Sequence, residues 1–116
     1  MDVTRIRSGA RMSQAVVHRG VVYLAGQVAT RREEDVAGQT RQVLASIDEL
    51  LAEAGSDKTR ILMATVWLAR MGDFDAMNAV WDAWVPAGQA PARACVESKL
   101  ARSDILVEIR AIAAVR

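Results

Sequence analysis

The sequence contains little of the material from which many catalytic sites are built. Its 116 residues include one cysteine, Cys95, and one histidine, His18. An internal disulfide is therefore excluded, and a zinc site of Cys and His ligands has too few candidates. A Ser-His-Asp triad would depend on His18, and no nucleophile-elbow motif lies near it. The chain also lacks a glycine-rich phosphate-binding motif, which leaves carboxylates, arginines, backbone amides and bound water for chemistry.

An excess of charge of one sign is also absent. Fifteen basic and fourteen acidic residues give a formal net charge of +1, which argues against nucleic acid binding by massed phosphate neutralisation. No apolar run reaches the roughly 18 residues of a membrane span, and Met1–Arg7 does not resemble a signal peptide. We therefore expect a cytoplasmic protein. Lys58 and Lys99 are the only lysines, so the basic side chains are nearly all arginine, which suits forked binding of a carboxylate.

The remaining composition is that of a globular protein, with 52% hydrophobic and 25% charged residues. The length predicts one domain over residues 1–116. A monomer of this size buries roughly two-thirds of its unfolded surface, so its core is thin and assembly would help to stabilise it.

The first third of the chain predicts strands. Residues Val3–Arg7 alternate and favour a short first strand. The apolar runs Gln14–His18 and Val21–Ala25 flank Arg19-Gly20, which is typical of a hairpin with a two-residue turn. Gly26 follows and is expected to end the second strand of the hairpin.

Helical periodicity begins at Val36 and continues to Ala54, so this segment predicts a helix. Asp35 is placed to cap its N-terminus, and Gly55 fits the position that follows its C-terminus. The continuous apolar run Ile61–Leu68 predicts a buried central strand.

A second helix is predicted from an Asp73 cap to about Trp84, before Pro86 and Gly88. Its apolar face comprises Phe74, Met77, Trp81 and Trp84. We interpret this stripe as packing against a sheet and not as a cofactor site.

Two strands are predicted at the C-terminal end, Ala92–Leu100 and Ile105–Val115, joined by a turn at Ala101–Asp104. In the last strand the apolar residues share one face, and Glu108 and Arg110 face the other way. The element order predicts an α+β fold, a mixed β-sheet with two helices packed on one face. The open face is too apolar for water, and another subunit is expected to cover it.

Arg93 and Glu108 are the main candidates for chemistry. If their strands are antiparallel neighbours, the two side chains lie within reach of each other. Arg93 would hold a substrate carboxylate in two hydrogen bonds, and Glu108 would orient and deprotonate a water beside it. A structural ion pair across a hairpin explains the same spacing, and the residues alone leave both interpretations open.

Three segments together resemble one known family. Residues Pro91–Ile109 resemble the signature of the RidA family, also called YjgF or L-PSP proteins, in the Pro-Ala-Arg start and the closing Val-Glu-Ile. Met12-Ser-Gln-Ala-Val16 with Leu24-Ala-Gly-Gln27, and Asp73-Phe-Asp-Ala-Met-Asn78, match in the same order. The resemblance spans essentially the whole chain.

The resemblance implies an enamine/imine deaminase that hydrolyses 2-aminoacrylate, 2-iminopropanoate and related 2-imino acids to 2-keto acids and ammonia. It also implies a fold similar to the small trimeric chorismate mutase, a homotrimer, and sites between the subunits. No metal and no organic cofactor is implied. The small-molecule 2-imino acid is the expected partner, with no role for a membrane and none expected for nucleic acid.

The resemblance also implies roles for individual residues. Arg93 matches the arginine that binds the substrate carboxylate, and Glu108 matches the glutamate that positions the attacking water. Gly26 and Cys95 match positions whose backbone groups line the pocket, and Asn78 matches an asparagine at its rim.

Two departures from the family pattern stand out. Met12 replaces a common tyrosine, and Ala25 replaces a common serine or threonine. Loss of the tyrosine hydroxyl removes a polar contact near the reacting carbon. The sequence is therefore similar to a sister subgroup of the family that keeps the arginine and the glutamate.

Alternatives from other classes remain. One is a non-catalytic trimer that binds small carboxylates through Arg93 or acts as a holdase. Another is an endoribonuclease or translation inhibitor, against which the neutral charge and the few aromatics argue. Cys95 is interpreted as a small buried hydrophobe, with a reactive thiol as the alternative, and His18 as a solvated turn residue.

Overall fold

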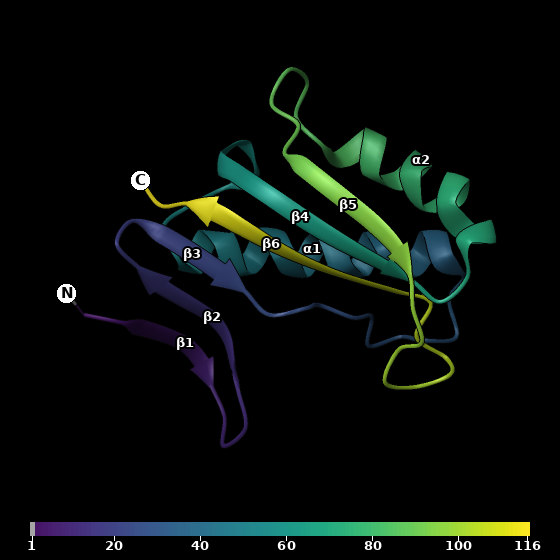
Figure 1. The fold of residues 1–116 in the computed structure, drawn as a ribbon, viewed down its shortest axis with the longest axis horizontal. Helices are drawn as coiled ribbons and strands as arrows, with labels where there is room; N and C mark the ends of the chain where they lie inside the picture. The colour runs from purple at the N-terminus through teal and green to yellow at the C-terminus, as the bar shows by residue number, and fades with distance from the viewer. Residues whose placement is uncertain (1) are drawn as a thin grey trace.

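A computed structural model describes residues 2–116 of the protein. Within them the chain forms six strands and two α-helices, with short 3₁₀ turns at Lys58–Arg60 and Met71–Asp73. In chain order the elements are β1 (Thr4–Ser8), β2 (Ser13–His18), β3 (Val21–Leu24), α1 (Val36–Glu53), β4 (Ile61–Leu68), α2 (Phe74–Trp84), β5 (Ala92–Glu97) and β6 (Val107–Ala114). The predicted order of elements is confirmed (Figure 1).

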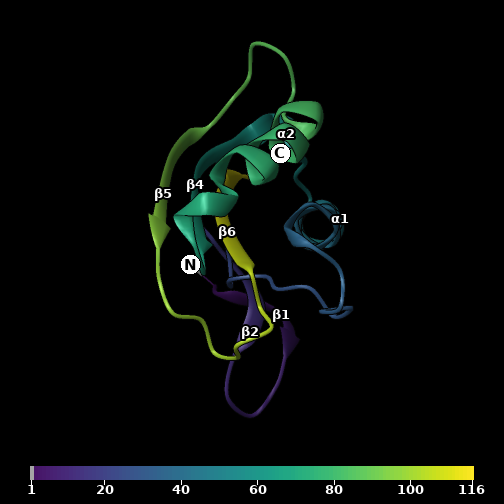
Figure 2. The ribbon, with the colours of Figure 1, turned by 90° about the vertical axis from the view of Figure 1, so that its right-hand side faces the viewer.

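The strands form one sheet in the order β1-β2-β3-β6-β4-β5. Neighbouring strands are antiparallel, except that β4 and β5 run parallel because the chain returns through α2 between them. The last strand, β6, therefore lies inside the sheet, between β3 and β4 (Figure 1). Figure 2 shows both helices on the same face of this sheet. The predicted fold class is confirmed.

The core lies between the sheet and its two helices. The molecule measures 43 × 38 × 20 Å, and the shortest extent matches one sheet and one helix layer of about 10 Å each. Large side chains are fully buried in this layer: Val43, Ile47, Leu50, Leu51, Leu68, Met77, Val107 and Ile109. On the other face of the sheet Tyr23, Met63 and Val96 are 48%, 48% and 45% exposed. The apolar face left open by the helices is therefore present as predicted.

The β2–β3 hairpin forms at the predicted place because its turn suits glycine. Arg19 and Gly20 have φ angles of 51° and 77°, the left-handed pattern of a type I′ turn. Glycine adopts such angles without strain. The turn sets the register, in which Ala15 pairs with Leu24 and both side chains are buried in the core.

The first helix confirms the roles predicted for Asp35 and Gly55 at its two ends. The Asp35 carboxylate accepts a hydrogen bond from the backbone N–H of Gly38 at 2.9 Å, which satisfies one free donor of the first turn. At the other end Gly55 has a φ of 80°, a conformation that favours glycine. The helix ends at Glu53, one residue before the predicted Ala54. Neither helix in the described part of the chain is long and apolar enough to cross a bilayer.

The predicted start and end of the second helix are confirmed, because α2 begins at Phe74, directly after Asp73, and ends at Trp84, but the predicted capping bond is not formed. Asp73 belongs to the 3₁₀ turn that precedes α2, and its side chain makes no capping hydrogen bond. A cap residue needs extended backbone, whereas Asp73 has a φ of −88° and a ψ of 2°. The apolar stripe is confirmed for Met77 and Trp81, which are buried. Phe74 differs, because it lies in the exposed first turn.

The last two strands are shorter than predicted. β5 ends at Glu97 and not at Leu100, and β6 begins at Val107 and not at Ile105. The buried side chain of Gln39 in α1 takes over the hydrogen bonds before β6: its Nε2 donates to the Asp104 carbonyl at 3.0 Å, and its Oε1 accepts from the Leu106 N–H at 2.9 Å. These backbone groups are therefore satisfied without a strand partner.

Candidate functional site

Glu108 lies on the open face of the sheet. Its neighbours in β6, Val107 and Ile109, are buried in the core, so the two-residue period of the strand turns Glu108 outward. Its cross-strand partner is Trp67 of β4. A Cβ at Gly26 would collide with the Glu108 carboxylate, so glycine at this position lets the carboxylate lie close against the backbone.

The segment around Gly26 is held against β6 by its neighbour Gln27. The backbone N–H of Gln27 donates to the Ile109 carbonyl at 2.8 Å, and the Ile109 N–H donates back at 3.2 Å. The Gln27 side-chain amide also donates to Gln14 Oε1 at 2.9 Å. The sequence analysis did not predict these contacts of Gln27. The motif Leu24-Ala-Gly-Gln27, which contributes to the family resemblance, is the sequence feature that could have indicated them. Glu108, Gly26, Gln27 and Trp67 are called the glutamate group below.

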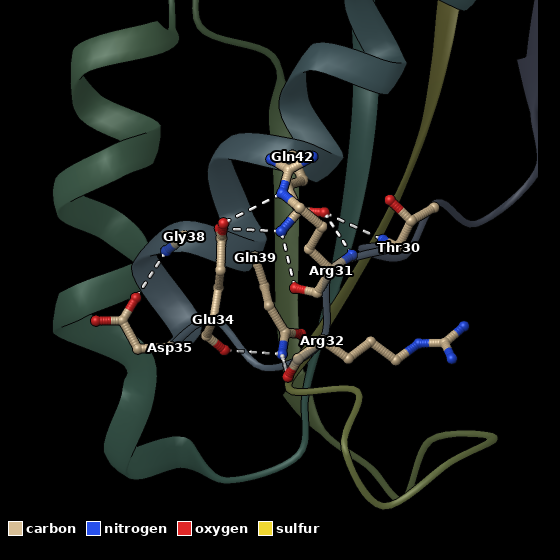
Figure 3. A network of polar contacts seen from close by, with 8 residues as sticks. All are labelled: Thr30, Arg31, Arg32, Glu34, Asp35, Gly38, Gln39 and Gln42. Atoms are coloured by element: carbon tan, nitrogen blue, oxygen red, sulfur yellow. Dashed lines mark hydrogen bonds and ion pairs between the residues drawn. The ribbon is translucent and has the colours of Figure 1, made fainter.

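A polar network fixes the segment that leads from Gln27 to α1 (Figure 3). The Gln42 Nε2 donates to the Arg31 carbonyl at 2.9 Å and to Glu34 Oε1 at 3.0 Å. The hydrogen bond from Gln42 and the neighbouring Arg31 hold the pKa of Glu34 below its ordinary value. The buried Gln39 amide donates to the Glu34 carbonyl at 3.1 Å. The network orders the chain that follows Gly26 and so supports its position.

Arg93 lies on the opposite, helix-facing side of the sheet. Its cross-strand partner in β4 is Ala64, which is buried in the core. The Arg93 guanidinium carbon lies 4.9 Å from the centre of the Trp81 ring, which is a cation–π distance. Arg93 Nη1 is buried and has no hydrogen-bond partner among residues 2–116. A buried N–H donor without a partner is available to bind an anionic ligand.

Asn78 and Cys95 lie on the same side as Arg93. Asn78 is one helical turn before Trp81 in α2, and its Oδ1 is also buried without a partner in the described chain. Cys95 is partly buried and packs against the core. Burial raises the pKa of its thiol, and the nearby Arg93 opposes this more weakly. The raised pKa favours the interpretation of Cys95 as a small hydrophobe. Arg93, Trp81, Asn78 and Cys95 are called the arginine group below.

The two groups do not meet within one chain. The expectation that Arg93 and Glu108 lie on neighbouring antiparallel strands is wrong, because β4 lies between β5 and β6 and runs parallel to β5. Arg93 is level with Ala64 and Glu108 with Trp67, and the two side chains point to opposite faces. Regular strand spacing puts their Cα atoms about 14 Å apart. A structural ion pair between them in one chain is excluded by the same placement.

The other predicted residues divide between the two ends of the sheet. Met12, 47% exposed, is in the β1–β2 loop, and Ala25 directly follows β3, both at the end that carries Glu108. His18 lies at the opposite end, beside the β2–β3 turn, with its Nδ1 3.2 Å from the Asp2 carbonyl oxygen. His18 and Glu108 therefore cannot act together as an acid–base pair within a chain.

A groove of about 680 Å³ runs between α1 and α2. Small apolar side chains, among them Ala45, Ala79 and Ala83, form much of its wall. Neither Arg93 nor Glu108 lines it. The groove is therefore separate from the site residues that the sequence predicts.

Comparison with known proteins places the chain among relatives that it matches end to end. Residues 3–115 match the family model described as "Endoribonuclease L-PSP". The chain is 47% identical to a RutC family protein of Haemophilus ducreyi over 113 residues, which cover 97% of each protein. It is 44% identical to the RutC family protein YoaB of Escherichia coli strain K12, over 99% of this chain and 100% of the relative.

Solved structures agree with the sequence relatives. NMB1025, a member of the YjgF protein family from Neisseria meningitidis, has a TM-score of 0.97 and 49% identity over 100% of this chain and 97% of that one. A putative translation initiation inhibitor from Salmonella typhimurium has a TM-score of 0.90 and 41% identity, with 97% of each chain covered. The family resemblance predicted from the sequence is confirmed: the chain belongs to the L-PSP family, the family of the RutC and YjgF proteins.

Proposed function

We propose that the protein is an enamine/imine deaminase that hydrolyses 2-aminoacrylate, 2-iminopropanoate and related 2-imino acids to 2-keto acids and ammonia. The observation that carries the proposal is the buried Nη1 of Arg93, which has no hydrogen-bond partner among the described residues 2–116. A guanidinium with a free donor, partly shielded from solvent, can bind the carboxylate that every 2-imino acid carries.

The proposed site is completed by assembly. The arginine group lies on the helix side of the sheet at its β5 edge, whereas the glutamate group lies on the open face. We propose a homotrimer in which the β5 edge of one subunit meets the open face of the next. Such a head-to-tail contact closes into a ring of three and covers the exposed Tyr23, Met63 and Val96.

In this arrangement Arg93 of one subunit holds the substrate carboxylate beside Glu108 of its neighbour. Glu108 takes a proton from water as the water oxygen bonds to C2 of the imine, and the C=N electron pair goes to nitrogen, which becomes protonated. The amino group of the resulting carbinolamine then takes the proton held by Glu108, the hydroxyl proton passes to solvent water as C=O forms, and the C–N bond breaks to release ammonia. An enamine such as 2-aminoacrylate first tautomerises to the imine by protonation at C3.

The chemistry demands little of the protein beyond orientation and one base. Imines hydrolyse in water unaided, so holding the substrate and a water in reacting geometry supplies much of the acceleration. The resemblance carries the roles of Gly26 and Cys95 as backbone contacts and of Asn78 at the rim into this proposal. No step requires a metal or an organic cofactor.

The experiment that tests the proposal generates the imine in place with an amino-acid oxidase and traps it with semicarbazide. An active deaminase lowers semicarbazone formation from the imine and speeds the appearance of the keto acid. If purified protein binds pyruvate through Arg93 but leaves imine decay unchanged, the protein is the non-catalytic carboxylate-binding alternative.

The endoribonuclease alternative is tested in parallel with metal-free, gel-purified protein and labelled RNA. The placement of His18 at the far end of the sheet from Glu108 removes the acid–base pair such cleavage would need within a chain. We expect intact RNA. Cleavage that copurifies with the protein and disappears in Glu108→Gln would contradict the deaminase assignment.

A further inference from the structure

Trp81 lies directly beneath the guanidinium that the proposed function uses. Its side chain is buried, with 6% of the residue exposed, and its ring centre is 4.9 Å from the Arg93 guanidinium carbon. Trp81 in turn packs on Trp84, with ring centres 5.3 Å apart. The Trp84 Nε1 donates to Asp48 of α1 at 3.0 Å. The two indole rings thus form a chain of contacts from Asp48 in α1 to Arg93 at the β5 edge.

The stacking of Arg93 on a ring differs from the support of three arginines that are paired with carboxylates. Arg7, Arg31 and Arg116 each have a carboxylate partner, which occupies their donors. An aromatic ring instead covers one flat side of a guanidinium and leaves its N–H edge free. Arg93 Nη1 has no hydrogen-bond partner in the described residues, and the guanidinium packs on the Trp81 ring. The stack therefore orients Arg93 without using the donors that a ligand needs.

We propose that Trp81 is a positioning residue that holds Arg93 ready for forked binding of a carboxylate, an inference that rests on the proposed function for the identity of the ligand. An arginine side chain on an edge strand has several rotatable bonds, and fixing them before the ligand arrives lowers the entropic cost of binding. Replacing the ring with an aliphatic side chain leaves the charge in place but loses the orientation. The expected result is weaker carboxylate binding, by roughly three- to thirtyfold.

The first test observes Arg93 directly in the free protein by NMR of its Nε–H group. Stacking on Trp81 shifts this proton resonance upfield, and Arg93→Lys identifies the signal by removing it. Trp81→Leu is expected to return the resonance to the ordinary arginine position. Arg110, stacked over Trp67 at 5.6 Å on the other face, is the internal reference and should not move. An Arg93 resonance that is the same in wild type and Trp81→Leu overturns the proposal.

The second test measures binding of pyruvate, a stable carboxylate, to the assembled protein. Trp81→Tyr keeps a ring and is expected to bind nearly as well as wild type, whereas Trp81→Leu binds three- to thirtyfold more weakly. Trp84→Phe is the matched control, because it keeps a ring against Trp81 and removes the hydrogen bond to Asp48. In an Arg93→Ala background Trp81→Leu should cause no further loss, because the two residues act through one contact.

The outcomes separate this inference from the proposed function. Arg93-dependent pyruvate binding that is unaffected in Trp81→Leu overturns the role of Trp81 and leaves the deaminase standing. The predicted binding series without imine hydrolysis overturns the deaminase and supports Trp81. Equal losses in Trp81→Leu and Trp84→Phe, or a further loss in the Arg93→Ala background, show general packing damage and overturn the positioning role.

Discussion

Gly26→Ala should displace the proposed catalytic base, Glu108, without replacing it. An added Cβ would collide with the Glu108 carboxylate, so the carboxylate must move by about 1 Å or more. A displacement of that size costs about a hundredfold in rate, which corresponds to about 2.7 kcal/mol in the barrier. We expect this loss in kcat, with pyruvate binding by Arg93 little changed.

The fold should tolerate the same substitution. The φ of Gly26 lies outside the left-handed region, and the atoms in the way are the end of a flexible side chain. Gly72→Ala is the matched control, because a Cβ there meets no heavy atom within 4 Å. The free energy of unfolding of both variants should lie within about 1 kcal/mol of the wild-type value.

The assay is imine hydrolysis with the oxidase-coupled system, at several substrate concentrations so that kcat and KM separate. Wild-type kcat in Gly26→Ala, with the assembly of the wild-type protein retained, would refute the placement of Glu108 as the base. A loss of equal size in Gly72→Ala would show that the effect comes from general damage. Gly26→Ala combined with Glu108→Gln should be no slower than Glu108→Gln alone, because both changes remove one function.

The other predictions concern the charged pair and the thiol. Arg93→Ala should lose the charge-assisted contact, on the order of 1.5–3 kcal/mol in kcat/KM, and Arg93→Lys should restore little because a point charge cannot form the fork. Wild-type kcat/KM in both variants would contradict this. Glu108→Gln should lower kcat by roughly 10²–10⁴ while pyruvate still binds; loss of pyruvate binding would contradict the role of base. Burial raises the pKa of Cys95, so its thiol should react with iodoacetamide more slowly than free cysteine at pH 8, and faster labelling would contradict that environment.

Local signals were sufficient for much of the fold. The hairpin turn at Arg19-Gly20 and the cap of α1 at Asp35 depend on residues close in sequence, so they can be predicted without the tertiary structure. The start of β6 is different. It is set by Gln39, whose side chain bonds the backbone 65 and 67 residues further along. The alternation of apolar and polar residues in a strand does not indicate a contact with a side chain so far away in the sequence.

The sequence singles out the residues of the proposed site, but it did not predict how they are arranged. The two C-terminal strands are consecutive, which suggests a hairpin, yet the crossover through α2 places β5 parallel to β4 and outside it. Arg93 and Glu108 therefore face opposite sides of the sheet. The stripe that contains Trp81 was correctly predicted to pack, but helical spacing could not show that its ring also lies against Arg93.

The central claim is that each site takes Arg93 from one subunit and Glu108 from the next, and mixing inactive subunits tests it most directly. Arg93→Ala and Glu108→Gln proteins are each assembled alone and then unfolded, mixed in equal amounts and refolded together. In randomly mixed trimers about a quarter of the interfaces pair an intact Arg93 with an intact Glu108, so the mixture should recover about a quarter of wild-type activity. Recovery to that level would support the shared site. A mixture of mixed trimers that stays as inactive as its parents would contradict it.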